Sequence, residues 1–305
     1  MRYKVAAFYK FVRLEDFKDI RKPLLETCRN LELSGTILLA SEGINGTVAG
    51  SDAGIDALVD YLLRDHRLQD LVFKFSHANE EPFRRIKVRL KKEIITLGAS
   101  GADATLRTGT HVPPAEWNEL ISDPEVLLLD TRNTYETAIG TFENAVDPKT
   151  ESFGEMVDFI DSNLANKKKR KIAMFCTGGI RCEKLSAHML EQGFDQVYQL
   201  SGGILKYLEE IPEANSNWKG DCFVFDHRVS VSHGLAEGPH TMCHGCGRAL
   251  DDKARSSKAY EKGVSCQHCA GSVTDEKRRA LRERQKQVDL AKERDTKHIG
   301  QKANR

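Results

Sequence analysis

Hydrophobic and polar positions alternate in short segments along the first hundred residues. Strand-like apolar runs occupy Tyr3–Phe11 and residues 35–40, 47–50, 71–76 and 83–95, and helical spacing occupies residues 14–31 and 52–63. A glycine- and asparagine-rich turn is expected at residues 41–46, Pro23 interrupts the first helix, and Ser51 or Asp52 caps the second. This order predicts a ferredoxin-like α+β domain over residues 1–97, with two helices on one face of an antiparallel sheet.

The pattern changes after a polar, glycine-containing linker at residues 98–111. Short, mostly apolar strands then alternate with helices. The strands are expected at Val126–Asp130, Lys171–Phe175 and 196–200 and the helices at 113–121, 151–164, 181–192 and 204–210, and residues 126–129 are wholly apolar. Strands without polar positions are typical of a parallel sheet that is buried on both faces. We therefore expect an α/β domain at residues 111–215. Residues 216–305 form a third part, a cysteine-rich module followed by a charged helix from about residue 274.

Composition narrows the class of protein. The 305 residues are 40% hydrophobic and 30% charged, which excludes a wholly disordered chain. The longest apolar runs reach five residues, against the ~20 needed to span a bilayer, so no membrane association is expected. There is no apolar signal segment at the start, and eight cysteines then indicate a reducing compartment. These features predict a cytoplasmic protein that keeps its thiols for metal binding or chemistry.

Cys176 stands where a buried strand turns into a helix through Gly178 and Gly179. Backbone N–H groups in such a turn, and the helix N-terminus behind it, stabilise an anion and lower the pKa of a thiol. Arg181 adds a positive charge and a fork of donors that we expect to face the loop. The candidate active loop thus comprises Cys176, Thr177, Gly178, Gly179, Ile180 and Arg181. In the alternative reading, Cys176 is a buried structural cysteine, and the glycines serve only the turn.

Three other cysteines are isolated in the sequence. Cys182, six residues after Cys176, is either a resolving thiol for an oxidised or persulfidated Cys176 or a small packing residue. Cys28 and Cys222 lie in apolar segments, and we expect both to be core residues.

The last four cysteines form two Cys-x2-Cys pairs that nineteen residues separate: Cys243 and Cys246, then Cys266 and Cys269. This spacing predicts a closed structural zinc site, in which four thiolates leave no open position for catalysis. His244 or His268 could replace a cysteine as ligand, although each lies between two better candidates. The alternative is a relict metal site, in which the cysteines are disulfide-bonded or hold no metal.

Basic residues alternate with apolar ones at residues 85–91. In a strand, Arg85, Lys87, Arg89 and Lys91 would share one face at intervals of about 6.5–7 Å and could follow a phosphate backbone. Ile86, Val88 and Leu90 would then form a buried face. The alternative is an edge strand whose charged side chains prevent it from pairing with another chain. Residues 276–305 carry eleven Lys or Arg against five Asp or Glu, so the tail is either a second RNA contact or a solvated terminus.

Several motifs resemble the rhodanese domain, whose active loop carries a cysteine persulfide. The resemblance lies in the loop from Cys176 to Arg181 and in the upstream and closing segments Leu129-Asp130-Thr131-Arg132 with Glu136, Gly140-Thr141-Phe142 with Asn144-Ala145, and Leu200-Ser201-Gly202-Gly203. Related phosphatases have five residues between cysteine and arginine, whereas this loop has four and suits a sulfur-sized group. A phosphatase is therefore a poor candidate.

The whole chain resembles the bacterial tRNA uridine(34) hydroxylase family. The resemblance rests on residues 41–47 (SEGINGT), 87–94 (KVRLKKEI) and 176–184 (CTGGIRCEK), in this order and at this spacing. It implies a reactive Cys176, tRNA bound through its anticodon stem-loop, and molecular oxygen as co-substrate for forming 5-hydroxyuridine at the wobble position. No 2-His-1-carboxylate signature and no glycine-rich dinucleotide motif occur, so the sequence indicates neither iron nor flavin nor nicotinamide.

Three functions remain in view at this point. The first is the hydroxylase. The second is a sulfurtransferase that carries a persulfide on Cys176, and the third is an RNA-binding module with the rhodanese domain as a scaffold. An intact cysteine loop with Arg181 argues against the third, because a scaffold needs neither residue. Sequence leaves open whether Cys176 works as thiolate, persulfide or sulfenate, which tRNAs bind, and what the oligomeric state is.

Overall fold

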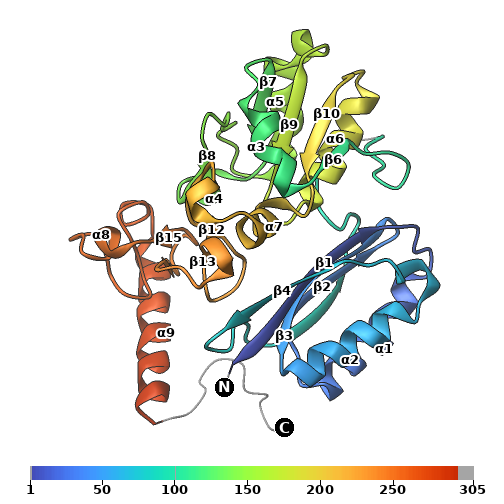
Figure 1. Ribbon diagram of the computed structural model, residues 1–305. Helices are drawn as coiled ribbons and strands as arrows, with labels where there is room; N and C mark the ends of the chain where they lie inside the picture. The colour runs from blue at the N-terminus through green and yellow to red at the C-terminus, as the bar shows by residue number, and fades with distance from the viewer. Residues whose placement is uncertain (1, 100, 295–305) are drawn as a thin grey trace.

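A computed structural model describes residues 2–99 and 101–294 in three packed parts (Figure 1). The first part contains β1 (Tyr3–Phe11), α1 (Phe17–Asn30), β2 (Ser34–Ala40), β3 (Gly43–Gly50), α2 (Asp52–Leu63), β4 (Phe73–Ala78) and β5 (Ile86–Leu90). Its sheet has the order β4-β1-β3-β2-β5, antiparallel except for the β2–β5 pair. Both helices cover one face, where Phe8 and Ile37 pack against Leu24 and Leu58. The ferredoxin-like prediction is confirmed, with β5 as an added edge strand.

Three local predictions for this part were wrong. The turn predicted at residues 41–46 is shorter, because β3 already begins at Gly43 and lies so close to β1 that a Cβ there would sit 2.0 Å from the Lys10 carbonyl oxygen. The strand predicted over residues 83–95 is limited to Ile86–Leu90, the length that pairs with β2. Pro23 does not interrupt α1, because it is exposed while Leu24 and Cys28 anchor the helix to the sheet.

The second part is a four-stranded parallel sheet in the order β6-β10-β9-β7. Its strands are β6 (Thr110–Val112), β7 (Val126–Asp130), β9 (Lys171–Phe175) and β10 (Val197–Leu200), and β8 (Gly140–Phe142) lies outside the sheet. Its helices are α3 (Pro114–Ser122), α4 (Thr134–Thr137), α5 (Met156–Asn163), α6 (Ile180–Glu191) and α7 (Gly203–Glu210). α5 and α6 pack on one face and α3 and α7 on the other. The predicted parallel sheet, buried on both sides, is confirmed.

The third part contains several short elements and one long helix, α9. They are β11 (Trp218–Gly220), β12 (Cys222–Phe223), β13 (Ser230–Val231), β14 (Thr241–Met242), β15 (Ala249–Leu250), α8 (Asp252–Arg255) and α9 (Asp275–Glu293). Trp218, Cys222 and Val231 belong to the same core as α7, so β11–β13 extend the second part rather than the cysteine-rich module. Cys28 and Cys222 are buried core residues, as expected.

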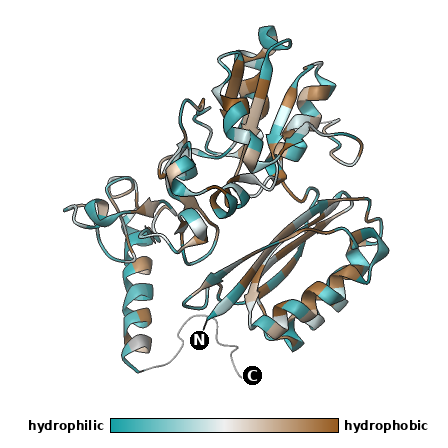
Figure 2. Cartoon of the chain, viewed as in Figure 1, coloured by the Kyte–Doolittle hydropathy of each residue, from teal (hydrophilic) through white to brown (hydrophobic). Residues whose placement is uncertain are grey.

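The basic tail is partly described. Lys277 donates to the Gly245 carbonyl, Arg278 to the Ala270 carbonyl, and Arg282 pairs with Glu261, so the first turns of α9 are bound to the cysteine-rich module. Residues 295–305, which the RNA-contact prediction for the tail also includes, lie outside the described residues. Figure 2 shows that α9 is hydrophilic over most of its length, whereas apolar residues concentrate on the strands. No helix in the described ranges is long and apolar enough to cross a membrane.

Candidate active site

The Cys176 loop leaves β9 at Phe175 and enters α6 at Ile180. The Cys176 side chain is buried, and its Sγ accepts a hydrogen bond of 3.1 Å from the Gly179 N–H. Gly179 has a φ of +101°, a left-handed conformation that favours glycine, and it takes the N-cap position of α6. The loop therefore has the expected geometry, in which a helix N-terminus and a backbone donor point at the sulfur.

The start of α7 is hydrogen-bonded to this loop. The N–H groups of Ile204 and Leu205 donate to the carbonyls of Cys176 and Thr177, each at 3.0 Å. Gly203 has a φ of +69°, and a Cβ there would lie 2.6 Å from the Cys176 carbonyl oxygen. Gly203 is thus explained by the close approach of the two loops, whereas a Cβ on Gly202 would meet the Lys206 side chain.

Arg181 is buried, and its donor fork, which we expected to face the loop, is paired with a carboxylate. Its two terminal nitrogens donate to Glu136 Oε2 and Oε1 at 2.6 and 2.7 Å, and one of them also lies 3.3 Å from Thr177 Oγ1. Glu136 is fixed in turn by the Asn133 N–H at 3.1 Å. The guanidinium fork is occupied by a carboxylate, so Arg181 acts on the sulfur through its charge.

Cys176 in the loop and Cys182 in α6 differ in pKa. Burial alone would raise the pKa of Cys176, but a hydrogen bond from Cys182, the charge of Arg181 and nearby backbone N–H groups together bring that pKa below its usual range. Burial and the neighbouring Cys176 thiolate raise the pKa of Cys182 well above its usual range. Cys182 also lies 3.7 Å from Thr131 Oγ1. The pKa of Cys176 is thus lowered and that of Cys182 raised, so Cys176 is the more readily ionised thiol of the pair.

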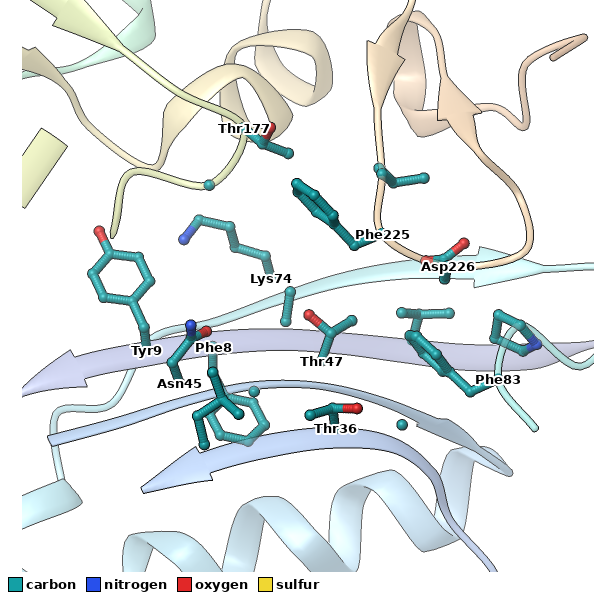
Figure 3. A pocket seen from close by; sticks show the side chains of 18 of the residues that line it. Phe8, Tyr9, Thr36, Asn45, Thr47, Lys74, Phe83, Thr177, Phe225 and Asp226 are labelled. Atoms are coloured by element: carbon teal, nitrogen blue, oxygen red, sulfur yellow. The ribbon is translucent and has the colours of Figure 1, made fainter. Parts of the chain in front are cut away.

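A cleft of about 1640 Å³ separates this loop from the uncovered face of the first sheet (Figure 3). Tyr9, Thr36, Thr47 and Lys74 line it from the sheet, and Thr177 and its neighbours line it from the loop. A row of neighbours crosses the sheet here in register: Lys74, Ala7, Thr47, Thr36 and Lys87. At about 4.8 Å per strand, the row spans roughly 19 Å. The floor of the cleft is therefore lined by small side chains, one alanine and two threonines, and the row has a lysine at each end.

Three of the four predicted basic residues line this cleft: Arg85, Lys87 and Arg89. Partial burial and the charges of Arg85 and Arg89 lower the pKa of Lys87. Lys91 lies one residue beyond β5 and is exposed. The alternation is correct for Ile86 and Val88, which pack on the core, but Leu90 is exposed at the end of the edge strand.

Charged residues from three distant segments join the two large parts of the molecule. Lys184 Nζ, which is buried, lies 2.7 Å from Glu42 Oε2 and 2.6 Å from Glu93 Oε2. Glu42 also accepts from the Ile94 N–H at 2.7 Å. This ion triad fixes α6, and with it the Cys176 loop, to the first sheet.

A second cluster lies beside the triad. Glu183 accepts hydrogen bonds from Tyr9 OH at 3.2 Å and from Gln199 Nε2 at 3.0 Å, and its Oε1 lies 2.9 Å from His111 Nε2. Burial, with the nearby charges of Glu183 and Cys176, raises the pKa of Tyr9 well above its usual range, so Tyr9 stays a donor. A Cβ on Gly179 would lie 2.7 Å from Tyr9 OH, so the first sheet closely approaches the active loop.

The four cysteines of the third part come together in a cluster, and none of them lines the cleft. Their Sγ atoms all lie within 4.8 Å of one another, with separations of 3.8 Å for Cys243–Cys269, 3.7 Å for Cys246–Cys266 and 4.0 Å for Cys266–Cys269. Four sulfurs at about 2.3 Å from a tetrahedral zinc would be about 3.8 Å apart. The donor set and its spacing therefore fit one metal ion. None of the eight cysteines, all in the described residues, forms a disulfide.

Comparisons with known proteins agree with this architecture. Residues 3–94 match a family described as the UPF0176 acylphosphatase like domain, and residues 113–210 match the rhodanese-like domain. A protein of Teredinibacter turnerae named tRNA uridine(34) hydroxylase is 53% identical over 302 residues, which cover 99% of this chain and 94% of that protein. The chain belongs to the tRNA uridine(34) hydroxylase family.

Solved structures resemble single parts of this family member. The Alr3790 protein of Anabaena sp. is 20% identical, with a TM-score of 0.30, over 36% of this chain and 91% of that one. An acylphosphatase of Coxiella burnetii is 14% identical, with a TM-score of 0.23, over 29% of this chain and 93% of that one.

Several residues of the hydroxylase cleft were not singled out from the sequence. Lys74 and Tyr9 lie in strands with no motif around them, and Phe225 lies in the apolar segment that follows Cys222. Only the pairing of β1 with β4 and the position of the β12–β13 turn bring them opposite Cys176. Glu42, Glu93 and Lys184 do lie in the three segments that resemble the family. The opposite charges of these residues could have indicated the ion triad.

Proposed function

We propose that the protein hydroxylates C5 of uridine 34 in tRNA, with molecular oxygen as co-substrate and Cys176 as the reactive group. One observation carries the proposal beyond family membership: a single cleft joins the Cys176 loop to the basic edge of the first sheet. Ordinary small-molecule pockets measure about 300–1,000 Å³, so this cleft has room for more than one nucleotide. We also propose that the protein acts in the cytoplasm, where tRNA and reduced thiols occur together.

The cleft suits an unstacked base better than a helix. C5 of uracil is shielded by stacking in a duplex, whereas anticodon loop bases can turn outward. Phe225, in the turn between β12 and β13, is 58% exposed and stands in the cleft on the side of Thr177 (Figure 3). An exposed aromatic ring beside a polar floor is a stacking surface for a base. Phe225 would hold the target base while the basic edge holds the backbone.

Charge reversal at Arg85, Lys87 and Arg89 is expected to weaken binding of the anticodon stem-loop and to flatten its salt dependence. Each lost phosphate contact should remove somewhat less than one unit from the slope of log affinity against log salt. Fluorescence anisotropy at several salt concentrations measures the slope. Reversal at Lys91, which lies outside the cleft lining, is the matched control and should change the slope least. An unaltered slope in the triple variant would mean that β5 is only a solvated edge.

We propose that Cys243, Cys246, Cys266 and Cys269 hold one structural zinc ion. A closed four-thiolate site supplies folding energy and no catalytic position. Anaerobically purified protein should contain about one zinc per chain. Chelation should unfold the module around these cysteines and spare the rhodanese part, whose core is separate. Metal analysis without zinc, together with free alkylation of all four thiols, would refute the assignment.

The sulfurtransferase alternative shares the loop but not the substrate. In that reaction Cys176 carries a persulfide, and the second substrate is a sulfane donor instead of oxygen. The test is to incubate the protein with an unmodified anticodon stem-loop, under oxygen or with thiosulfate in its absence, and to identify the product nucleoside by mass spectrometry. Under oxygen and without a sulfur donor, 5-hydroxyuridine should form, and free uridine should not react because it lacks the stem that the first domain holds.

A further inference from the structure

Lys74 is a cation in the active cleft that no part of the proposed function yet uses. It lies on β4, paired in register with Ala7, and points away from the helices into the cleft that the Cys176 loop closes. Figure 3 shows its side chain between the rings of Tyr9 and Phe225, on the side that faces the Thr177 loop. Its Nζ lies 5.0 Å from the centre of the Tyr9 ring, a cation–π contact.

The amine of Lys74 has no carboxylate partner among residues 2–99 and 101–294, unlike Lys184 nearby. The charged groups that face it are the Cys176 thiolate from the active loop, Glu183 from α6 and Lys206 from α7. Tyr9 on β1 presents its ring and stays protonated, and Asp226 and Arg228 beyond β12 neutralise each other at 2.6 Å. Burial and Lys206 lower the pKa of Lys74 to about 8, against the opposing effect of Cys176 and Glu183.

We propose that Lys74 is a second catalytic residue, which contacts O4 of the bound uracil and neutralises the negative charge that forms there when the Cys176 sulfur adds to C6. The proposal rests on the proposed function. In this step the thiolate electron pair forms the S–C6 bond, the C5–C6 π bond breaks, and its electron pair spreads over C5, C4 and O4 as an enolate. No electrons leave the system. C5, the carbon to be hydroxylated, becomes electron-rich.

The position of Lys74 suits this role. Charge stabilisation is most effective from a preorganised cation that already faces the place where the charge develops, and Lys74 lies in the cleft without an ion-pair partner among the described residues. An amine whose pKa is near neutral can also pass a proton to O4 and take it back when the sulfur leaves. Lys87, at the other end of the same row and roughly 19 Å away at about 4.8 Å per strand, is too far to do either.

The test compares Lys74→Met and Lys74→Arg with the wild-type protein on the anticodon stem-loop. Lys74→Met should lower kcat about 10²–10⁴-fold, the usual range for a general acid or base, and leave KM nearly unchanged. Its melting temperature should not fall, because the change removes a desolvated charge without a partner. Lys10→Met is the matched control, since Lys10 lies on β1, pairs with Asp70 outside the cleft, and should affect no kinetic constant.

The pH profile is the second readout. The reaction needs the protonated amine, so wild-type kcat/KM, which reports the pKa values of the free protein, should fall as the pH rises through the Lys74 pKa of about 8. Arginine stays charged to above pH 12, so Lys74→Arg should keep measurable activity and lose this alkaline fall. A Lys74→Met variant with wild-type kcat and an unchanged profile would overturn the assignment, as would a change confined to KM. Wild-type protein that forms no 5-hydroxyuridine at all would instead contradict the proposed function.

Discussion

Replacement of Cys176 by serine is expected to abolish the formation of 5-hydroxyuridine and to leave the fold intact. Oxygen replaces sulfur with little change in volume in a side chain that is fully buried. The hydroxyl, however, stays protonated where the thiol is held as thiolate, and it is far less polarisable. We expect a loss on the order of 10⁶-fold, the scale seen when a nucleophile is removed. Mass spectrometry of the nucleosides, with circular dichroism for the fold, measures both outcomes.

Cys28→Ser is the matched control, because it makes the same change in a buried cysteine of the first core, outside the cleft. It should retain activity. Full turnover by Cys176→Ser would show that the reaction does not need the Cys176 thiol, and it would contradict a central role of the rhodanese loop.

Replacement of Arg181 by alanine should destabilise the protein by about 3–5 kcal/mol, because it leaves Glu136 buried and without its partner. Activity should fall as well, since the charge of Arg181 helps to keep the pKa of Cys176 low. Urea unfolding at neutral pH measures the loss.

The pH dependence of this loss has a definite sign. Burial would raise the pKa of Glu136, but Arg181 holds it below its usual range. The pair therefore contributes stability above the unfolded pKa of about 4.3, and this stability disappears as the pH falls through the lower folded value. The deficit of Arg181→Ala should shrink in acid, and the double variant with Glu136→Gln should recover part of it. A deficit below about 1 kcal/mol at neutral pH, the scale of an exposed pair, would contradict the buried geometry.

The local structure of the active loop could be predicted from the sequence because its signals are local. A wholly apolar strand, two glycines and a helix with apolar spacing lie within twenty residues, and the structure confirms each of them. Gly43 is a counterexample, since its glycine serves a close approach of β1 rather than a turn. Arg181 is another. Its partner Glu136 lies 45 residues earlier, on α4, so no spacing around the loop could indicate where the guanidinium points.

The cleft could not be predicted from the sequence, because its walls come from three parts of the chain. Lys87 was predicted to face RNA from an alternating pattern within its own strand. Lys74 has no such pattern and is recognised only once β4 pairs with β1 and the ion triad of Glu42, Glu93 and Lys184 sets the sheet against the loop. Long-range pairing therefore decides which side chains meet Cys176.

The most direct test of the account is a reaction under oxygen-18 gas with purified protein and an unmodified anticodon stem-loop that contains uridine 34. The account predicts 5-hydroxyuridine at position 34, with one oxygen-18 atom taken from the gas, and no product from the Cys176→Ser protein. A protein that thiolates this stem-loop from thiosulfate but never hydroxylates it under oxygen would contradict the account.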